Sequence, residues 1–281
     1  MCTYSCSRID VEQKQNHVLN THRYDALSRS PSSCCLGAEA TFELERHIEI
    51  QLPFIRGGDL FEFISAAAES NTPLKTSVLK RMVRDISRGV SHLHRLGFAH
   101  MDLAAENVLV DISPEDGRVN RFLVMDYDLS LHIDVSSGFS KHDKTKLLNG
   151  RVGYSPPEIL AIQREKETHP PRFALDLRKV DAYGLGCILF IAVFSVPHCD
   201  ETGAESYTYR KLLQRGSFFF VKQWELQTFP SKEFFQLIDS LLHDDPEKRL
   251  SLSDLSNRNP WLHRDDVCDH IRLETDVFYY K

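Results

Sequence analysis

Apolar residues recur with a helical period over one long segment of the chain. From Ser77 to Leu96 they stand at positions 79, 82, 83, 86, 90 and 93, which predicts an amphipathic helix that Gly97 ends. Residues 180–194 ("VDAYGLGCILFIAVF") are instead apolar almost throughout, which predicts a helix buried on all sides. The chain from Val180 onward is mostly helical in pattern.

Shorter apolar runs predict strands on both sides of the long helix. "ATFELERHIEIQLPFI" predicts a β-hairpin with its polar turn at Glu45–His47, and "RGGDLFEFISAAAES" a Gly-Gly turn that leads into a short helix. "NVLV" and "RFLVMD" predict a second strand pair joined by the turn "SPEDG", followed by a long polar loop over residues 130–149. A smaller β-containing part therefore precedes a larger helical part, and the two join near Gly57.

Composition and charge exclude several classes of function. The 281 residues are 42% hydrophobic and 26% charged, as in ordinary globular proteins, and the net charge of -6 argues against a nucleic-acid partner. No apolar run approaches the roughly 20 residues of a membrane span, and the first residues lack the apolar core of a secretory signal. The seven cysteines are scattered and show no zinc-ligand spacing. We predict an intracellular protein, cytoplasmic in the first instance, with the nucleus left open.

Three polar side chains stand at the ends of the second predicted strand pair. Asp102 and Asn107 lie five residues apart in "AHMDLAAENVLV", and Asp126 follows the next strand in "VMDYDLS". Each alone is an ordinary turn former. If the two strands pair, however, the three converge, with two oxygen ligands for a hard cation beside a free carboxylate. That set suits Mg-ATP chemistry, in which the carboxylate orients a hydroxyl and accepts its proton.

The order of these motifs resembles that of the protein kinases. "HMDLAAEN" resembles the catalytic loop His-Arg-Asp-Leu-x-x-x-Asn, and "DYD" stands where that family has Asp-Phe-Gly. "GRVGYSPPE", "VDAYGLGCILF" and "DPEKRLSLSDLSNRNPWL" are similar to the end of the activation segment, the buried helix and the final Asp-Pro…Pro-Trp element. "PFIRGGDLFEFI" is similar to the segment after the ATP-binding hinge. The resemblance spans about residues 40–262 and implies an α+β, two-lobe kinase fold with a truncated β-containing N-lobe and a mainly helical C-lobe.

The resemblance implies ATP and Mg²⁺ as cofactors and assigns their contacts by position. Asp102 would be the catalytic carboxylate, and Asn107 and Asp126 the magnesium ligands. Contacts with the nucleoside would come from a further group of residues. In that group Pro53 and Ile55 would meet adenine through their backbone, Leu52 would be the gatekeeper, Leu109 would lie beneath the ring and Asp59 would bond the ribose.

Other matched positions imply structural and substrate-side roles. Glu158 and Arg249 resemble the family's buried ion pair, and Asp181 would hold the backbone of the catalytic loop. His100 in that loop and Tyr154 near the end of the activation segment belong to the same group. These residues would brace the site rather than perform the chemistry.

The chain departs from the family pattern before the hinge. Only 56 residues precede Gly57, and none forms a Gly-rich phosphate loop or a Val-Ala-x-Lys strand. Lys14 is the only lysine among them and lies in a polar, helical context. Glu12 is a candidate for the glutamate of helix C, with an exposed helix face as the alternative. The small lobe is therefore expected to be truncated.

Further departures concern the catalytic and activation segments. Met101 replaces the arginine before the catalytic aspartate, and Asp128 replaces the glycine of the metal motif. Ala104 and Arg151 stand where Ser/Thr kinases have a lysine and a threonine, although Glu106 is typical of the Ser/Thr enzymes. We hypothesise that Arg151 supplies the missing cation near the γ-phosphate.

These patterns predict four parts and one main function. The parts are a polar segment 1–40, partly disordered or a remnant of helix C, a residual N-lobe hairpin and hinge 41–56, a C-lobe 57–265 and a tail 266–281. We predict a protein kinase that favours Ser/Thr over Tyr, with Asp59 and Glu106 favouring a basic protein substrate. The alternative is a catalytically impaired pseudokinase or scaffold module. A small-molecule phosphotransferase fits less well because "YSPPE" and "DPEKR" resemble the substrate side of protein kinases. The sequence predicts no oligomeric state.

Overall fold

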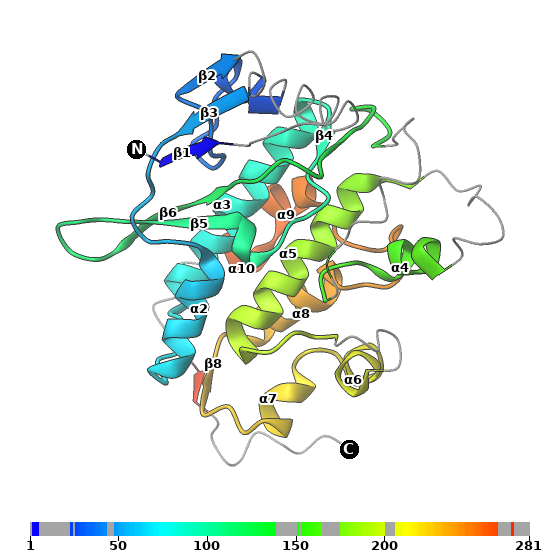
Figure 1. Ribbon diagram of the computed structural model, residues 1–281. Helices are drawn as coiled ribbons and strands as arrows, with labels where there is room; N and C mark the ends of the chain where they lie inside the picture. Colours follow the sequence, from blue (N-terminus) through cyan, green and yellow to red (C-terminus); the bar gives the residue numbers. More distant parts are fainter. Residues whose placement is uncertain are drawn as a thin grey trace.

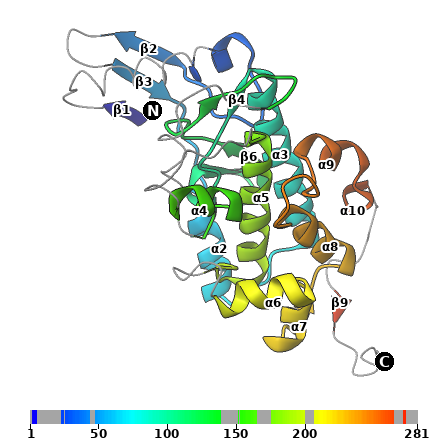
Figure 2. The same cartoon turned by 90° about the vertical axis from the view of Figure 1, so that its right-hand side faces the viewer.

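The structure of the protein is a computed structural model that describes residues 2–5, 23–24, 26–43, 48–138, 151, 153–164, 175–199, 206–263 and 271–272. A small β-sheet lobe lies above a larger, mainly helical lobe (Figures 1 and 2). The predicted α+β, two-lobe architecture is confirmed. Lys14 and Glu12 lie outside the described residues.

The small lobe contains a three-stranded antiparallel sheet in the order β1-β3-β2. Strands β2 (Ala40–Glu43) and β3 (Ile48–Leu52) form the predicted hairpin, whose turn lies outside the described residues. Strand β1 (Cys2–Ser5) pairs with the other edge of β3. The sequence did not predict β1, because four residues in polar surroundings give too short an alternation to detect.

Two long helices form the centre of the larger lobe. Helix α3 (Thr76–Arg95) buries the predicted apolar stripe and ends at Leu96, ahead of Gly97 with its φ of 84°. Helix α5 (Leu177–Phe194) is buried continuously over residues 180–192, as its apolar sequence predicts. It begins three residues earlier than predicted because Asp176 accepts a hydrogen bond from Arg178 N and caps it.

Shorter helices pack around this pair. Helix α2 (Leu60–Glu69) follows the Gly-Gly turn as predicted, and its N-cap Asp59 accepts a hydrogen bond from Glu62 N at 2.8 Å. The remaining helices are α4 (Pro157–Arg164), α6 (Tyr207–Arg215), α7 (Phe219–Gln223), α8 (Lys232–Leu241), α9 (Leu252–Arg258) and α10 (Pro260–His263). Strands β8 (Thr228–Phe229) and β9 (Ile271–Arg272) pair antiparallel near the base of this lobe.

Two further pairs of short antiparallel strands connect the helices of the larger lobe. Strands β5 (Val108–Ile112) and β6 (Val119–Val124) form the second predicted hairpin. Strands β4 (Phe98–Ala99) and β7 (Leu131–His132) also pair antiparallel. The prediction of an entirely polar loop over residues 130–149 was therefore wrong at its start, where Leu131 and Ile133 are buried.

The segment before the sheet is not simply polar. Tyr24, Leu27 and Cys35 are buried in the main core. Cys35 forms a β-bridge with Val124 of β6, and the ring of Tyr24 meets that of Tyr127 edge-on at 5.2 Å. The segment around Cys35 therefore packs along β6, where Leu36 N donates to Val124 O at 2.8 Å and Val124 N donates to Cys34 O at 3.0 Å. The sequence pattern missed this because isolated apolar residues among serines show no period.

Cys34, Cys35, Cys187 and Cys199 are buried free thiols. Cys187 lies in the buried helix α5 and is completely inaccessible to solvent. None of the described helices is both long enough and apolar enough to cross a membrane.

Candidate functional site

A buried carboxylate of α5 holds the backbone of the segment that carries Asp102. Asp181 Oδ2 accepts a hydrogen bond from His100 N, and its Oδ1 accepts one from Met101 N, each at 2.8 Å. His94 Nε2 of α3 lies 2.8 Å from the same Oδ2. Met101 has a φ of 69°, unusual for a side chain without polar atoms, and the two hydrogen bonds keep the segment in that conformation.

His100 ties this segment to the end of β6. Its Nδ1 accepts a hydrogen bond from Asp102 N at 3.3 Å. The other nitrogen, Nε2, therefore carries the proton and donates to the carbonyl oxygen of Met125 at 2.9 Å. Because Asp126 is the next residue, His100 sets the position of Asp102 relative to Asp126.

The amide of Asn107 faces Asp102. Its Nδ2 donates to the backbone oxygen of Asp102 at 2.7 Å and to Oδ2 of the same residue at 2.9 Å. Both amide hydrogens are thus used, so Oδ1 is the atom through which Asn107 could bind a cation. Asp126 follows one residue after Met125, whose N–H donates to the carbonyl of Asn107 at 3.0 Å. The pairing of β5 with β6 brings these three polar residues to one end of the hairpin.

The protonation of Asp102 depends on its surroundings. Burial raises the pKa of its carboxyl group, and the negative charge of Asp126 acts in the same direction. The charge of Arg151 and the hydrogen bond from Asn107 oppose that rise.

Arg151 pairs with two acidic residues of the catalytic segment. Its Nε lies 3.3 Å from Asp102 Oδ1, and its Nη1 lies 3.1 Å from Glu106 Oε1. Its backbone oxygen accepts hydrogen bonds from Tyr154 N at 3.1 Å and from Ser155 N at 3.2 Å. The turn therefore fixes the backbone of Arg151, and the two ion pairs hold its guanidinium group beside the carboxylate of Asp102.

The hinge segment packs directly on β5. Val110 N donates to Gly58 O at 3.0 Å, and Asp59 bridges to Leu109. A Cβ atom at Gly57 would lie 2.2 Å from the carbonyl oxygen of Val110, so only glycine fits there. This close contact places the chain after β3 beside the partly exposed side chain of Leu109.

The residues predicted to contact the nucleoside lie along this segment. Leu52 ends β3, and Pro53 and Ile55 follow it, all partly buried. Leu52 packs against the main core, and Leu109 is partly exposed beside this segment. The carboxylate of Asp59, however, is engaged as the N-cap of α2, and Glu106 is paired with Arg151.

The predicted ion pair lies deep on the substrate side. Arg249 is 1% exposed, and its guanidinium bonds Glu158 Oε1 at 2.6 Å and Oε2 at 2.9 Å. It also donates to the carbonyl oxygens of His243 and Lys179, each at 2.9 Å. Tyr154 lies close to the catalytic segment, where its hydroxyl accepts a hydrogen bond from Ala105 N at 3.4 Å. Burial and the charge of Glu106 raise the pKa of this hydroxyl.

The donor set fits a magnesium nucleotide only in part. In the described part of the chain, no group of three or more His, Cys, Asp or Glu residues could hold a metal by itself. Mg²⁺ commonly uses one or two protein oxygens and completes its shell with phosphates and water, which Asn107 and Asp126 could permit. Strands β1, β2 and β3 contain no lysine. Among the described residues, Arg151 is the cation that pairs with Asp102.

Sequence reasoning missed two residues of this region. His94 supports Asp181, but a histidine on a helix carries no local pattern that reveals such a partner. Arg23 is 5% exposed, and its guanidinium donates to the carbonyl oxygens of Asp128 and Ser130 after the metal motif. Burial lowers the pKa of Arg23 to about 10.

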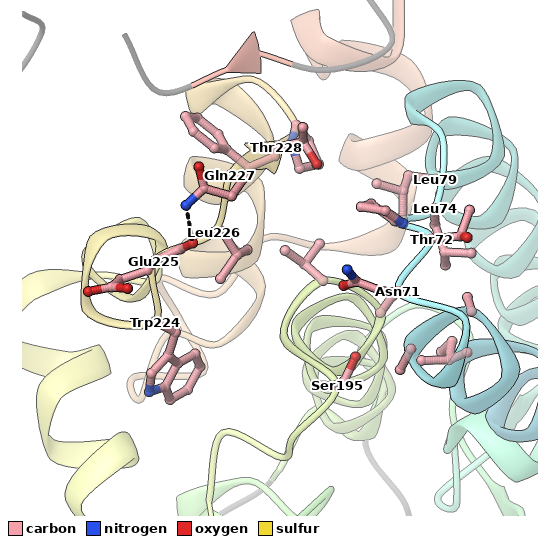
Figure 3. A pocket seen from close by; sticks show the side chains of 18 residues that line it. Asn71, Thr72, Leu74, Leu79, Ser195, Trp224, Glu225, Leu226, Gln227 and Thr228 are labelled. Atoms are coloured by element: carbon pink, nitrogen blue, oxygen red, sulfur yellow. Dashed lines mark hydrogen bonds between the residues drawn. The ribbon is translucent and has the colours of Figure 1, made fainter. Parts of the chain in front are cut away.

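A separate cavity of about 650 Å³ lies near the far end of the helical lobe. Figure 3 shows it between the α2–α3 connection, with Asn71 and Leu74, and the segment from Trp224 to Thr228, with Ser195 at the end of α5. None of the predicted site residues lines it. The cavity is therefore distinct from the site around Asp102.

Comparison with known proteins agrees with the motifs. The family model "Protein kinase domain" matches residues 10–262. The chain is 26% identical over 232 residues to the serine/threonine-protein kinase cds1 of Schizosaccharomyces pombe, which covers 82% of this chain and 44% of the relative. It is 29% identical to serine/threonine-protein kinase chk1 of the same yeast, over 76% of this chain and 37% of the relative. A human SNF-related serine/threonine-protein kinase is 28% identical over 80% of this chain and 25% of its own length. The chain thus spans less than half the length of these relatives.

Proposed function

Because the chain belongs to the protein kinase family, we propose that it transfers the γ-phosphoryl group of Mg-ATP to a serine or threonine hydroxyl of a protein. The main support is the Asp102 carboxylate, whose orientation is fixed by Asn107 at 2.9 Å and whose backbone segment is held by Asp181. Catalysis of this reaction consists mostly of positioning and charge stabilisation. The Ser/Thr class rests on the similarity to relatives that are serine/threonine-protein kinases.

Asp102 would orient the acceptor hydroxyl and take its proton. A general base must be ionised and within hydrogen-bond reach of that proton. The opposing effects of burial and of Arg151 leave the pKa of Asp102 raised, which suits proton acceptance better than an ordinary surface carboxylate would. Asn107 Oδ1 and the Asp126 carboxylate would hold magnesium, which neutralises phosphate charge when bound.

Arg151 would take over the role of the absent lysine. In this proposal its guanidinium neutralises charge at the phosphate while remaining beside Asp102, from which Nε is 3.3 Å away. Its planar fork spreads the donors over three nitrogens, so Nε and Nη1 can each serve a different partner. The backbone anchor from Tyr154 and Ser155 limits how far Arg151 can move.

Adenine would bind between the hinge and β5. Pro53 and Ile55 would present backbone groups to the base, Leu52 would flank it and Leu109 would lie beneath it. The ribose contact of Asp59 competes with its hydrogen bond from Glu62 N at 2.8 Å.

The proposed phosphate acceptor is a hydroxyl group of a protein. A preference for basic residues was expected from Asp59 and Glu106, but both carboxylates already have partners within the chain. We propose that the reaction takes place inside the cell, which the buried free thiols support.

Thermal melting with and without Mg-ATP tests the nucleotide part of this proposal. At one hundred times the dissociation constant, a specific ligand stabilises the folded state by about 2.7 kcal/mol, which gives a measurable shift. Asp126→Asn should remove most of the shift. Asp116→Asn is the matched control because Asp116 lies on the exposed β5–β6 turn. An equal shift in all three proteins would contradict the assignment of Asp126.

Transfer of radiolabelled phosphate to a mixed serine/threonine peptide library tests the catalytic part. Asp102→Asn should reduce transfer by at least a hundredfold while leaving the Mg-ATP shift in place. A nucleotide shift without any transfer by the unaltered chain would favour the alternative of a pseudokinase. The pairing of Asp102 Oδ1 with Arg151 and the lack of a lysine in β1–β3 are the observations that support that alternative.

A further inference from the structure

A second polar pocket lies behind the catalytic segment. It has a volume of about 390 Å³ and is formed by the C-terminal turn of α3, the start of α5, the start of α9 and Val135. At roughly 30 Å³ for each water molecule, this volume holds about a dozen waters. The pocket is therefore large enough for a small charged group together with part of the molecule that carries it.

The lining of this pocket is basic in a protein of net charge -6. Arg95, Arg178 and Lys179 line it, and Asp176 is the one acidic residue among the described residues of its lining. Asp176 binds Arg178 through two contacts of 2.8 Å, which offsets one of the three charges. Arg95 bonds His92, and Lys179 bonds the backbone oxygen of Arg249. In the described part of the chain, neither Arg95 nor Lys179 has a carboxylate partner.

Hydroxyl groups complete the lining. The Oγ atom of Ser91 is shielded from solvent and has no hydrogen-bond partner, an arrangement that costs free energy unless a ligand satisfies it. Ser91 stands one helical turn before Arg95, so both lie on the same face of α3. Ser251 and Ser253 lie across the pocket at the start of α9. Ser251 Oγ already donates to Asp254 Oδ2 at 2.7 Å, so a group with several acceptor oxygens would satisfy the cations and the hydroxyl of Ser91.

The pocket is connected to the catalytic segment through a short chain of hydrogen bonds. His94 lines the pocket and lies 2.8 Å from Asp181, which accepts the N–H groups of His100 and Met101. A ligand that contacts His94 is therefore two side chains away from the backbone of the segment that carries Asp102.

We propose that this pocket binds the phosphate of a phosphoserine or phosphothreonine residue of a protein, held by Arg95, Lys179 and the hydroxyl of Ser91. A phosphomonoester carries close to two negative charges and three acceptor oxygens, so it matches two uncompensated cations and an unpaired donor better than a carboxylate does. The volume beyond the phosphate accommodates the residue that carries it. This site would recognise a phosphorylated partner, in addition to any substrate bound at Asp102.

Isothermal titration calorimetry on the full chain without nucleotide tests this inference. The probe is the peptide Gly-Ala-Ala-pSer-Ala-Gly-Ala, compared with its unphosphorylated form and with inorganic phosphate. We expect binding of the phosphopeptide, at least tenfold weaker binding of the other two, and at least a tenfold loss in both Arg95→Gln and Lys179→Met. Ser91→Ala should weaken binding severalfold without lowering the melting temperature.

Two controls separate the site from its alternatives. Arg118→Gln removes an arginine that is 85% exposed on the β5–β6 turn and should leave the affinity unchanged. Asp102→Asn should also leave it unchanged, because the peptide is not expected to occupy the catalytic site. Equal binding of the phosphorylated and unphosphorylated peptides, inorganic phosphate binding as tightly as the phosphopeptide, or full affinity in folded Arg95→Gln would each overturn the proposal.

Discussion

The contact between Arg151 and Asp102 allows a decisive prediction. The change is Arg151→Gln, which keeps a polar side chain but removes the charge and the fork of donors. The Arg151 side chain is 39% exposed and that of Asp102 is 9% exposed, so the ion pair lies at the edge of the solvent. The substitution should therefore change the reaction rate only slightly if Arg151 has a structural role, and strongly if Arg151 takes part in catalysis.

The two roles differ in magnitude. A solvent-exposed ion pair contributes roughly 0.2–1 kcal/mol, which would change a rate by no more than about fivefold. Loss of a preorganised donor to developing charge instead costs about 10²–10³ in kcat. We expect the larger effect, at least a hundredfold in kcat/KM for a serine/threonine peptide, with little change in melting temperature. Arg151→Lys should recover only part of the loss, because a single ammonium nitrogen does not reproduce the planar fork whose Nε and Nη1 contact Asp102 and Glu106 separately.

The pH dependence gives a second readout of the same substitution. Asp102 must be ionised to accept a proton, and burial already raises its pKa while Arg151 lowers it. Removing Arg151 raises that pKa further, so activity should be lost at a higher pH as the solution is acidified. Arg118→Gln, on a distant exposed turn, should leave both the rate and the profile unchanged. A rate within fivefold of the unaltered chain together with an unmoved acid limb would refute the role of Arg151.

Three further substitutions test the framework of the site. Arg249→Met leaves the Glu158 carboxylate without its cation and should lower the free energy of unfolding by about 3–5 kcal/mol in urea titrations. Adding Glu158→Gln should restore part of this stability. A loss below about 1 kcal/mol would contradict the ion-pair argument. Gly57→Ala places a Cβ atom 2.2 Å from a β5 carbonyl oxygen and should lower the free energy of unfolding by roughly 1–3 kcal/mol. Gly37→Ala is the control, because a Cβ atom there meets no atom within 4 Å and should not lower the stability in this way. Asp181→Asn replaces one accepting oxygen by a donor and should reduce phosphoryl transfer at least tenfold. The circular dichroism spectrum should be unchanged. Unimpaired transfer would show that the hydrogen bonds of Asp181 do not position the catalytic segment.

Elements with a clear period were predicted well. Helices α3 and α5 and the hairpins β2–β3 and β5–β6 lie where the sequence places them, because burial of one face or of a whole helix is written into consecutive residues. Strands β1 and β7 were missed, since each is too short to show alternation and is stabilised by pairing with distant residues.

The site divides in the same way. The order of the motifs and one predicted strand pairing predicted that Asp102, Asn107 and Asp126 lie at the same end of the β5–β6 hairpin. The partners of Arg151 could not, because they are Asp102 and Glu106, which lie 49 and 45 positions away in the chain.

The sequence by itself determined the kinase-like order of motifs, the two-lobe division and the identity of the oxygen-bearing side chains, since these depend on local pattern and spacing. Only the tertiary structure decided that Arg151 faces Asp102, that Asp59 and Glu106 are already engaged, and that a basic pocket lies behind His94. The physical reason is that pairing of charges and buried hydrogen bonds depends on distances between segments that are remote in the chain, and periodicity carries no information about those distances.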